Sequence, residues 1–273
     1  MDGHLLDIVR LAWCRELGLD DAALATPGRV TRVDDASALV RVLRLGDVSA
    51  VVGPGWVVDA VATVPDAELD ASALLDLTRG HAVRSHALSY CADWVDATRV
   101  RDPLISHEVD DLAELLRRCP PDDATEAGLE IVTEAGLENV TEAGLENVTE
   151  AGLEIVTEAG LENVTEAGLE NVTGEASSFV LLDDDHRPLS GAVYTEVQSI
   201  LADVTALTVP EHRRIGLAAT VATLATHDAL DAGLVPQWRA RRDNTAGRGL
   251  AAVLGYTELG THISVAVPAA AGT

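Results

Sequence analysis

The sequence contains no lysine: all 19 basic residues among its 273 are arginines. Against 45 aspartates and glutamates they leave a formal net charge of −26. Binding to nucleic acid needs clustered positive charge that faces the phosphates, so this composition argues against a nucleic-acid partner. Two explanations of the acidity stay open: a high-salt source, in which an acidic surface remains soluble, or attraction of a cationic substrate. The spread of the acids along the whole chain favours the first.

Cysteines and long apolar runs are also scarce. The three cysteines, Cys14, Cys91 and Cys119, are odd in number, far apart and without a C-x-x-C pair. They predict neither a disulfide framework nor a zinc site, and the eight histidines show no ligand spacing, so we expect no metal. No apolar run reaches the length of a membrane span, and the first residues carry early acids instead of a basic segment. We therefore expect a cytoplasmic protein with no membrane partner.

The feature that stands out instead is a tandem repeat. Six copies of the octapeptide T-E-A-G-L-E-x-V follow one another from Thr125 to Val172. Leucine and valine recur at spacings of three and five, so each copy rotates the apolar stripe around a helix and no single face stays buried. The alternatives are an irregular helix, a small stacked solenoid or a flexible acidic arm. We favour irregular helix or disorder.

The position of the repeat indicates how the chain is organised. One copy would suit a helix end that leads into the following strand, whereas the other five resemble a tandem duplication at a junction. Surface junctions tolerate such insertions because the cost of loop closure grows slowly with length. We expect an α/β region at 1–122, the repeat at 123–174, a second domain at 175–267 and a tail at 268–273.

The N-terminal region reads as a mixture of helices and strands. Apolar residues at helical spacing predict a helix within His4–Leu19. Alternating β-branched runs predict strands, and further periodic segments predict helices. The predicted strands are Val30–Val33, Ala38–Leu45, Ser49–Val52 and His86–Trp94, and the predicted helices are Ala71–Leu77 and Asp110–Arg118.

The segment after the repeat predicts the order strand, strand, strand, helix, strand, helix, strand. These elements are Phe179–Leu182, Leu189–Val197, Ser199–Val209, Gly216–Ala232, Pro236–Ala240, Thr245–Leu254 and His262–Val267. Gly233 and Gly255 end the two helices, as glycine commonly does at a helix C-terminus. The fold class expected from this order is α/β with a mixed sheet.

The turn between the third strand and the next helix carries the chemistry. It reads T-V-P-E-H-R-R-I-G-L-A, from Thr208 to Ala218. A helix N-terminus offers unpaired N–H groups and a favourable dipole to an anion. Gly216 permits close approach of a ligand to the backbone, and Arg213 and Arg214 add charge-assisted donors. The residues themselves therefore predict a phosphate or pyrophosphate site.

This turn and a later segment resemble the GNAT superfamily of acyl-coenzyme A-dependent N-acetyltransferases. The family's pyrophosphate loop has Gln or Arg, two variable residues, Gly, one variable residue and Gly or Ala, and Arg213–Ala218 reads R-R-I-G-L-A. Asp243–Gly260 is similar to the family's later segment, in which Asn244 stands eleven residues before Gly255. The resemblance covers about residues 175–267 and implies a GNAT-type fold.

The resemblance implies that acetyl-coenzyme A is the cosubstrate and that it lies between the third strand and the P-Q-W-R-A strand. Backbone groups of the third strand would pair with the pantetheine arm, the loop amides would hold the pyrophosphate, and Asn244 would contact the cofactor arm. The residues implied for cofactor binding are Leu207, Val209, Arg213, Arg214, Ile215, Gly216, Leu217, Ala218, Ala219 and Asn244.

The resemblance also implies direct attack of an amine on the thioester, without a covalent enzyme intermediate. Such attack needs a base for the ammonium, and Glu196 and Asp203 are the candidates because both lie on strands beside the expected cleft. The backbone amide near Val209 would hold the oxyanion. At the position where the family often has a tyrosine that acts as the general acid, this sequence has Ala251. Tyr256 is a weak candidate acid, because it occupies the position of a core phenylalanine, and Tyr194 is a remote one.

Two classes of function remain open. The first is an N-acetyltransferase that acts on a small-molecule or peptide amine. The second is a non-catalytic module that binds coenzyme A or a protein, with the repeat as an acidic arm. The Arg213–Ala218 turn and Asn244 favour the enzyme. The N-terminal region either shapes the acceptor side or is a degenerate acetyltransferase half, and the oligomeric state stays open, a homodimer included.

Overall fold

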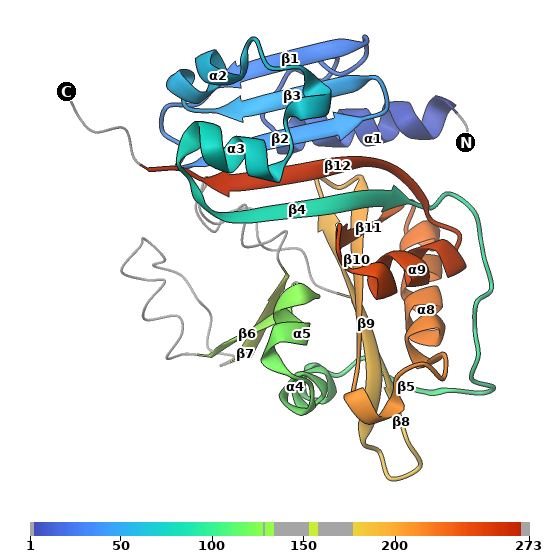
Figure 1. Cartoon of the computed structure of the whole chain (residues 1–273). Coiled ribbons are helices and arrows are strands. Elements are labelled where there is room, and N and C mark those ends of the chain that lie inside the picture. Colours follow the sequence, from blue (N-terminus) through green and yellow to red (C-terminus); the bar gives the residue numbers. More distant parts are fainter. Residues whose placement is uncertain (1–2, 128, 134–152, 158–176, 269–273) are drawn as a thin grey trace. The chain divides into compact units, whose positions relative to one another are not determined.

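A computed structural model describes residues 3–127, 129–133, 153–157 and 177–268 of the chain (Figure 1). The chain divides into two compact units that it enters in alternation. The first unit contains Met1–Tyr90, Arg239–Gly249 and Thr257–Thr273, and the second contains Cys91–Trp238 and Leu250–Tyr256. Among the described helices, none is both long and apolar enough to cross a membrane.

The first unit is built on a mixed sheet with the strand order β1–β3–β2–β12–β4. Its strands are β1 Gly28–Val33, β2 Leu39–Leu45, β3 Val48–Gly53, β4 His81–Tyr90 and β12 Thr257–Ala266. β1 and β3 run parallel, and the other neighbours run antiparallel. Strand β12, red in Figure 1, pairs with both β2 and β4, so segments from opposite ends of the chain build one sheet.

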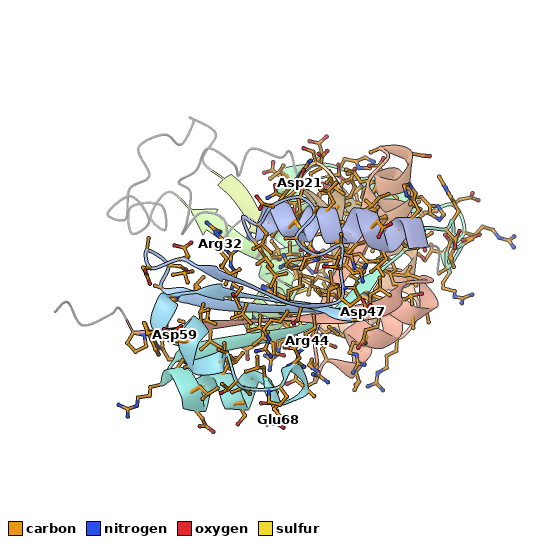
Figure 2. All side chains as sticks on the ribbon, turned by 90° about the horizontal axis from the view of Figure 1, so that it is seen from above. Asp21, Arg32, Arg44, Asp47, Asp59 and Glu68 are labelled. Atoms are coloured by element: carbon orange, nitrogen blue, oxygen red, sulfur yellow. The ribbon has the colours of Figure 1, made fainter. Side chains whose placement is uncertain are left out.

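Helices cover both faces of this sheet. Helix α1 (Gly3–Glu16) lies on one face, and α2 (Gly55–Val61), a 3-10 helix (Asp66–Glu68) and α3 (Ala71–Thr78) lie on the other. Figure 2 shows Asp59 and Glu68 on the side away from α1. Alternation along β2 sets the two faces, because Val42 joins the core under α2 and α3 whereas Arg41 donates to the carbonyl of Glu16 at the end of α1.

The second unit has the strand order β11–β10–β9–β8–β5. Its strands are β5 Leu104–Ser106, β8 Ser177–Leu182, β9 Pro188–Val197, β10 Leu201–Thr208 and β11 Val235–Arg241, of which the last three residues are grouped with the first unit. β10 and β11 run parallel and the other pairs run antiparallel. Because β5 pairs with β8, the first boundary lies after Tyr90 and not at the expected residue 122.

Helices also cover both faces of the second sheet. Helices α4 (Val109–Arg118) and α5 (Pro121–Glu126) lie on one face, and α8 (Leu217–Asp231) lies on the other (Figure 1). The first residues of helix α9 (Thr245–Val253) are grouped with the first unit and its last residues with the second. The leucines of α4 share a core with Val193 and Leu207. Gly191 leaves room for α4, because a Cβ at Gly191 would meet Cδ2 of Leu115 at 2.7 Å. On the opposite face, the hydroxyl of Tyr194 donates to Asp228 of α8 at 2.7 Å.

The described parts of the octapeptide repeat are residues 125–127, 129–133 and 153–157, and its other residues lie outside the described part of the chain. Two stretches form strands, β6 (Leu129–Thr133) and β7 (Leu153–Thr157), which pair antiparallel. Both stretches belong to the copies that carry isoleucine. The irregular helix or disorder that we favoured is therefore wrong for these two stretches.

The first copy of the repeat belongs to the core of the second unit. The side chain of Leu129 is 1% exposed and packs in the same cluster as Val180 and Leu207. The carbonyl of Ala127 accepts a hydrogen bond from the hydroxyl of Thr205 on β10 at 2.7 Å. One copy is thus built into the fold on the face that α4 and α5 cover.

The α1 face of the first unit buries an unpaired histidine. His262 on β12 is 1% exposed, and neither ring nitrogen has a hydrogen-bond partner among the described residues. The ring centre of Trp13 lies 5.0 Å from that of His262. Burial, followed by the nearby charges of Arg239 and Arg41, lowers the pKa of His262 to about 3. His262 is therefore neutral at pH 7, and its protonation opposes folding.

We expect His262 to make the folded state less stable as the pH falls from about 6.5 towards about 3, because over that range the unfolded histidine binds a proton and the folded one does not. Between pH 7 and about pH 4.5 the loss is roughly 2–3 kcal/mol at 1.36 kcal/mol per pKa unit. Urea unfolding of a His262→Leu variant will lack this part of the pH dependence. His81→Gln changes an exposed histidine of β4 and serves as the control. Equal pH slopes for wild type and His262→Leu would contradict the assignment.

A second prediction concerns the repeat. Leu129→Ala will lower the free energy of unfolding by about 2–5 kcal/mol, because it removes a buried side chain and leaves a cavity. Deletion of Thr133–Val172 removes five copies and β7 with them but keeps Leu129, and it will lower the urea midpoint less than Leu129→Ala does. Leu104→Ala, at a position 45% exposed, is the control. A deletion that destabilises the protein as much as Leu129→Ala would show that the fold needs the other copies.

Candidate functional site

The junction between β10 and α8 has the strand–loop–helix form that the sequence predicts. β10 ends at Thr208, a 3-10 turn covers Pro210–His212, and α8 begins at Leu217. Gly216 precedes the helix with φ +90°, a left-handed conformation that glycine adopts far more readily than other residues. This geometry turns the chain sharply from the strand into the helix.

The start of α8 leaves backbone donors open. No side chain among the described residues caps the helix, and its first backbone bond runs from the amide of Thr220 to the carbonyl of Gly216 at 3.2 Å. The amides of Leu217, Ala218 and Ala219 precede that bond and have no carbonyl of the helix to pair with. The dipole of a 15-residue helix adds partial positive charge at the same place. An anion is the ligand that these donors suit.

The two arginines predicted to bind phosphate differ in the hydrogen bonds that their side chains already make. The Nε atom of Arg213 donates to the carbonyl of Thr208 at 3.0 Å, and its Nη2 atom donates to Asp123 of α5 at 2.6 Å. Arg213 therefore ties the loop to β10 and to α5. Arg214 is exposed, and its side chain has no polar partner within the described ranges. Arg214 is thus the predicted arginine whose guanidinium remains open to a ligand.

The segment between β4 and β5 also contacts the start of α8. The amides of Arg99 and Val100 donate to Oγ1 of Thr220 at 3.0 and 3.3 Å. The side-chain stem of Arg99 lies against Gly216, where a Cβ would meet its Cγ and Cβ atoms at 2.6 and 2.7 Å. Sequence reasoning missed Arg99, because no local pattern indicates a contact between positions so far apart.

Strand β10 has an open edge near the loop. It pairs with β11 only where Leu201–Val204 faces Val235–Trp238, whereas its pairing with β9 continues to Thr208. The β11-facing edge from Thr205 to Thr208 therefore has no strand partner in the described part of the second unit. An extended ligand can pair with such an edge through backbone hydrogen bonds.

The register of β10 corrects two sequence assignments. The amide of Val209 donates to the carbonyl of Leu189 at 3.0 Å, so it is already used and does not fit the predicted oxyanion contact. In an antiparallel pair the backbone groups of successive residues point to opposite edges. Leu207 therefore also faces β9, and Ala206 and Thr208 face the open edge. The predicted pairing of Leu207 and Val209 with pantetheine is wrong by one residue.

The two candidate bases lie on opposite faces of the second sheet. Asp203 is half-buried on the face of Thr205, beneath α4 and α5, and accepts a hydrogen bond from Nε2 of Gln237 at 3.1 Å. Glu196 is exposed and shares its face with Tyr194, which contacts α8. One site on one face can therefore use only one of them, and Asp203 is the one held by a neighbouring side chain.

The structure places Tyr256 among packed side chains, which does not favour the role of general acid predicted for it. Its side chain is 6% exposed, and its hydroxyl shares a hydrogen bond of 2.8 Å with that of Thr226. Its ring lies edge-on to Trp238, with the centres 5.9 Å apart. Burial raises the pKa of Tyr256 far above its usual value. Its hydroxyl is thus engaged with Thr226 and largely shielded from solvent.

Asn244 belongs to the first unit. Its Oδ1 atom accepts a hydrogen bond from the amide of Gly247 at 2.6 Å, so its side chain caps the start of α9. The contact with the cofactor arm that the resemblance implies for Asn244 stays a prediction.

Residues 168–263 match the family model described as GNAT acetyltransferase. The matched segment contains the β10–α8 loop and Asn244, and it confirms the resemblance found at about residues 175–267. The C-terminal part of the chain is therefore similar to the GNAT acetyltransferase domain. A comparison with curated proteins gave no match.

Solved structures similar to this chain include several acetyltransferases. A putative GNAT-family acetyltransferase from Novosphingobium aromaticivorans is 19% identical with a TM-score of 0.41, over 69% of this chain and 66% of that one. A GNAT-family acetyltransferase from Colwellia psychrerythraea is 15% identical with a TM-score of 0.42, over 74% and 63%. A GCN5-related N-acetyltransferase-like protein from Streptococcus suis is 19% identical with a TM-score of 0.40, over 98% and 100%. The chain thus spans just under two thirds of the length of the first two proteins, and the assignment rests on the domain match.

Proposed function

We propose that the protein is an N-acetyltransferase that moves an acetyl group from acetyl-coenzyme A to an amine. The observation that carries this proposal is the match of residues 168–263 to the GNAT family model, at the place where β10 delivers open amides to the start of α8. Neither feature alone defines the reaction, because a helix N-terminus serves many anions. Their coincidence on one segment favours coenzyme A as the ligand.

The cofactor would bind along β10 and end at α8. The amides of Leu217, Ala218 and Ala219 would hold the pyrophosphate, and Arg214 would add a charge-assisted donor. Backbone groups of Ala206 and Thr208 would pair with the amides of the pantetheine arm, in the manner of an added strand. This arrangement places the thioester beside the edge of β10.

The reaction would proceed by direct attack. Asp203 would accept the proton of the ammonium, through a water molecule if needed, and the amine nitrogen would then form a bond to the thioester carbon. An amide on the open edge of β10 would stabilise the oxyanion. Collapse of the intermediate breaks the C–S bond, and the second proton of the amine nitrogen passes to the departing thiolate, so that coenzyme A leaves as the free thiol. An alkyl thiol has a pKa of about 8.5, so this leaving group needs no dedicated acid, which fits the burial of Tyr256.

The charge of the chain bears on the acceptor. A net charge of −26 attracts cationic molecules at low ionic strength, and a protonated amine is cationic. We propose a small-molecule or peptide amine as the acceptor. The rival function is a module that binds coenzyme A without catalysis. The two differ in one observable, because only the enzyme releases free thiol when an amine is supplied.

Isothermal titration calorimetry tests the cofactor assignment. We expect wild type to bind acetyl-coenzyme A, and Gly216→Glu to abolish binding, because the new carboxylate repels the pyrophosphate and a side chain is strained at φ +90°. Leu77→Glu adds the same charge at a position 38% exposed in the first unit and should bind like wild type. Absence of binding by wild type in both low and high salt would refute the proposed function.

A thiol-release assay with a panel of amines tests the base. We expect Asp203→Asn to lower kcat by about 10²–10⁴-fold with little change in the KM for acetyl-coenzyme A, since the base acts on the amine and not on the cofactor. Glu196→Gln changes an exposed carboxylate on the opposite face and should alter kcat less than about threefold. A larger loss in Glu196→Gln than in Asp203→Asn would reverse the assignment. Cofactor binding without thiol release from any amine would favour the non-catalytic rival.

A further inference from the structure

We propose that Arg99 binds a phosphate group of the acyl-coenzyme A cosubstrate and acts as a specificity-determining residue for the cofactor. This inference rests on the proposed function and extends it to a residue outside the matched segment of 168–263. Arg99 lies on the connection between β4 and β5, far along the chain from the loop that the GNAT pattern defines.

The need for another cation follows from the charges of the cosubstrate. Coenzyme A carries a pyrophosphate and a 3′-phosphate, and the chain carries a net charge of −26 that opposes their approach. Of the two loop arginines, Arg213 already donates to Thr208 and to Asp123. Arg214 alone would leave several phosphate oxygens without a charged partner. A third guanidinium at the same place would lower the energy of the bound anion.

Arg99 can provide that guanidinium, because its backbone is held beside the start of α8. Its amide and that of Val100 are both anchored on Thr220, a residue of the first turn of α8 that is 0% exposed. Thr220 in turn donates to the carbonyl of Gly216 at 3.2 Å. The backbone that carries Arg99 is thus bonded to the helix start that holds the open amides.

The side chain of Arg99 is directed by Gly216. Its stem fills the space that a Cβ of Gly216 would occupy, at distances of 2.6 and 2.7 Å from that position. Gly216 therefore serves two purposes: it adopts the left-handed turn and it admits the stem of Arg99. Arg99 is exposed, and its guanidinium has no hydrogen-bond or ion-pair partner in the described part of the chain. Asp96 lies within electrostatic range, because hydrogen bonds from Thr98 and, after them, the charges of His227 and Arg99 lower the pKa of Asp96. An arginine whose aliphatic chain is packed and whose guanidinium has no ion-pair partner is available to bind an anion.

Arg101 provides a matched control. It lies two residues further along the same connection, it is exposed, and it has no polar partner within the described ranges. Its removal changes the net charge as much as removal of Arg99. A general electrostatic effect would weaken binding equally in both variants, whereas a direct contact would affect Arg99 alone.

The experiment is calorimetric titration of the full-length protein with coenzyme A and with 3′-dephospho-coenzyme A. The variants are Arg99→Met, which keeps an apolar stem on Gly216 and removes the charge, Arg99→Lys and Arg101→Met. We expect Arg99→Met to weaken binding of coenzyme A about tenfold, Arg99→Lys to retain part of the affinity, and Arg101→Met to stay within about twofold of wild type. Melting curves of all variants should match wild type, because the head is exposed.

The second ligand identifies the phosphate. If Arg99 contacts the 3′-phosphate, Arg99→Met and wild type will bind 3′-dephospho-coenzyme A equally, and if it contacts the pyrophosphate, the variant will lose about tenfold with both ligands. Either result supports the inference. Equal affinities of Arg99→Met and Arg101→Met for coenzyme A would overturn it while leaving the proposed function intact. Failure of wild type to bind either ligand would overturn the proposed function itself.

Discussion

The turn at Gly216 is the constraint on which the candidate site depends. Its left-handed backbone aims the start of α8 at the end of β10, so that open amides follow directly on an open strand edge. Its missing side chain admits the stem of Arg99 from a distant part of the chain. Any other residue at this position would strain the turn and displace that stem. One glycine thus sets both the direction of the donors and the access of an extra cation.

The local features of this site follow from the sequence, and the order of strands and helices after the repeat agrees with its periodicity. The open amides at the start of α8 can be predicted from a short stretch of sequence, because the strand, the glycine and the helix are consecutive in the chain. The direction of the backbone groups of β10 cannot be predicted in the same way, because it depends on pairing with β9. The hydrogen bond from the amide of Val209 to the carbonyl of Leu189 decides which residues of β10 face the open edge. A shift of one residue reverses the direction of every backbone group, and the family resemblance carries no register, so it assigned Leu207 and Val209 to the wrong edge.

Long-range pairing explains the other differences between expectation and structure. β5 is three residues long, too short to show a period, and it is defined by its pairing with β8 across the repeat. β4 begins at His81, five residues before the expected start, and β12 begins at Thr257 rather than at His262, because each gains ladder bonds from the other. The burial of Tyr256 and the contact of Arg99 with Gly216 also depend on tertiary packing that no short window contains.

The first copy of the repeat is part of the fold of the second unit. This copy packs Leu129 into the core and bonds Ala127 to β10, beside the strand that would carry the cofactor. The central claim is that coenzyme A lies along β10 and against α8, and a crystal structure of the protein with coenzyme A tests it most directly. The account predicts phosphate oxygens within hydrogen-bonding distance of the amides of residues 217–219, and pantetheine paired with Ala206 and Thr208. Coenzyme A bound elsewhere would contradict it.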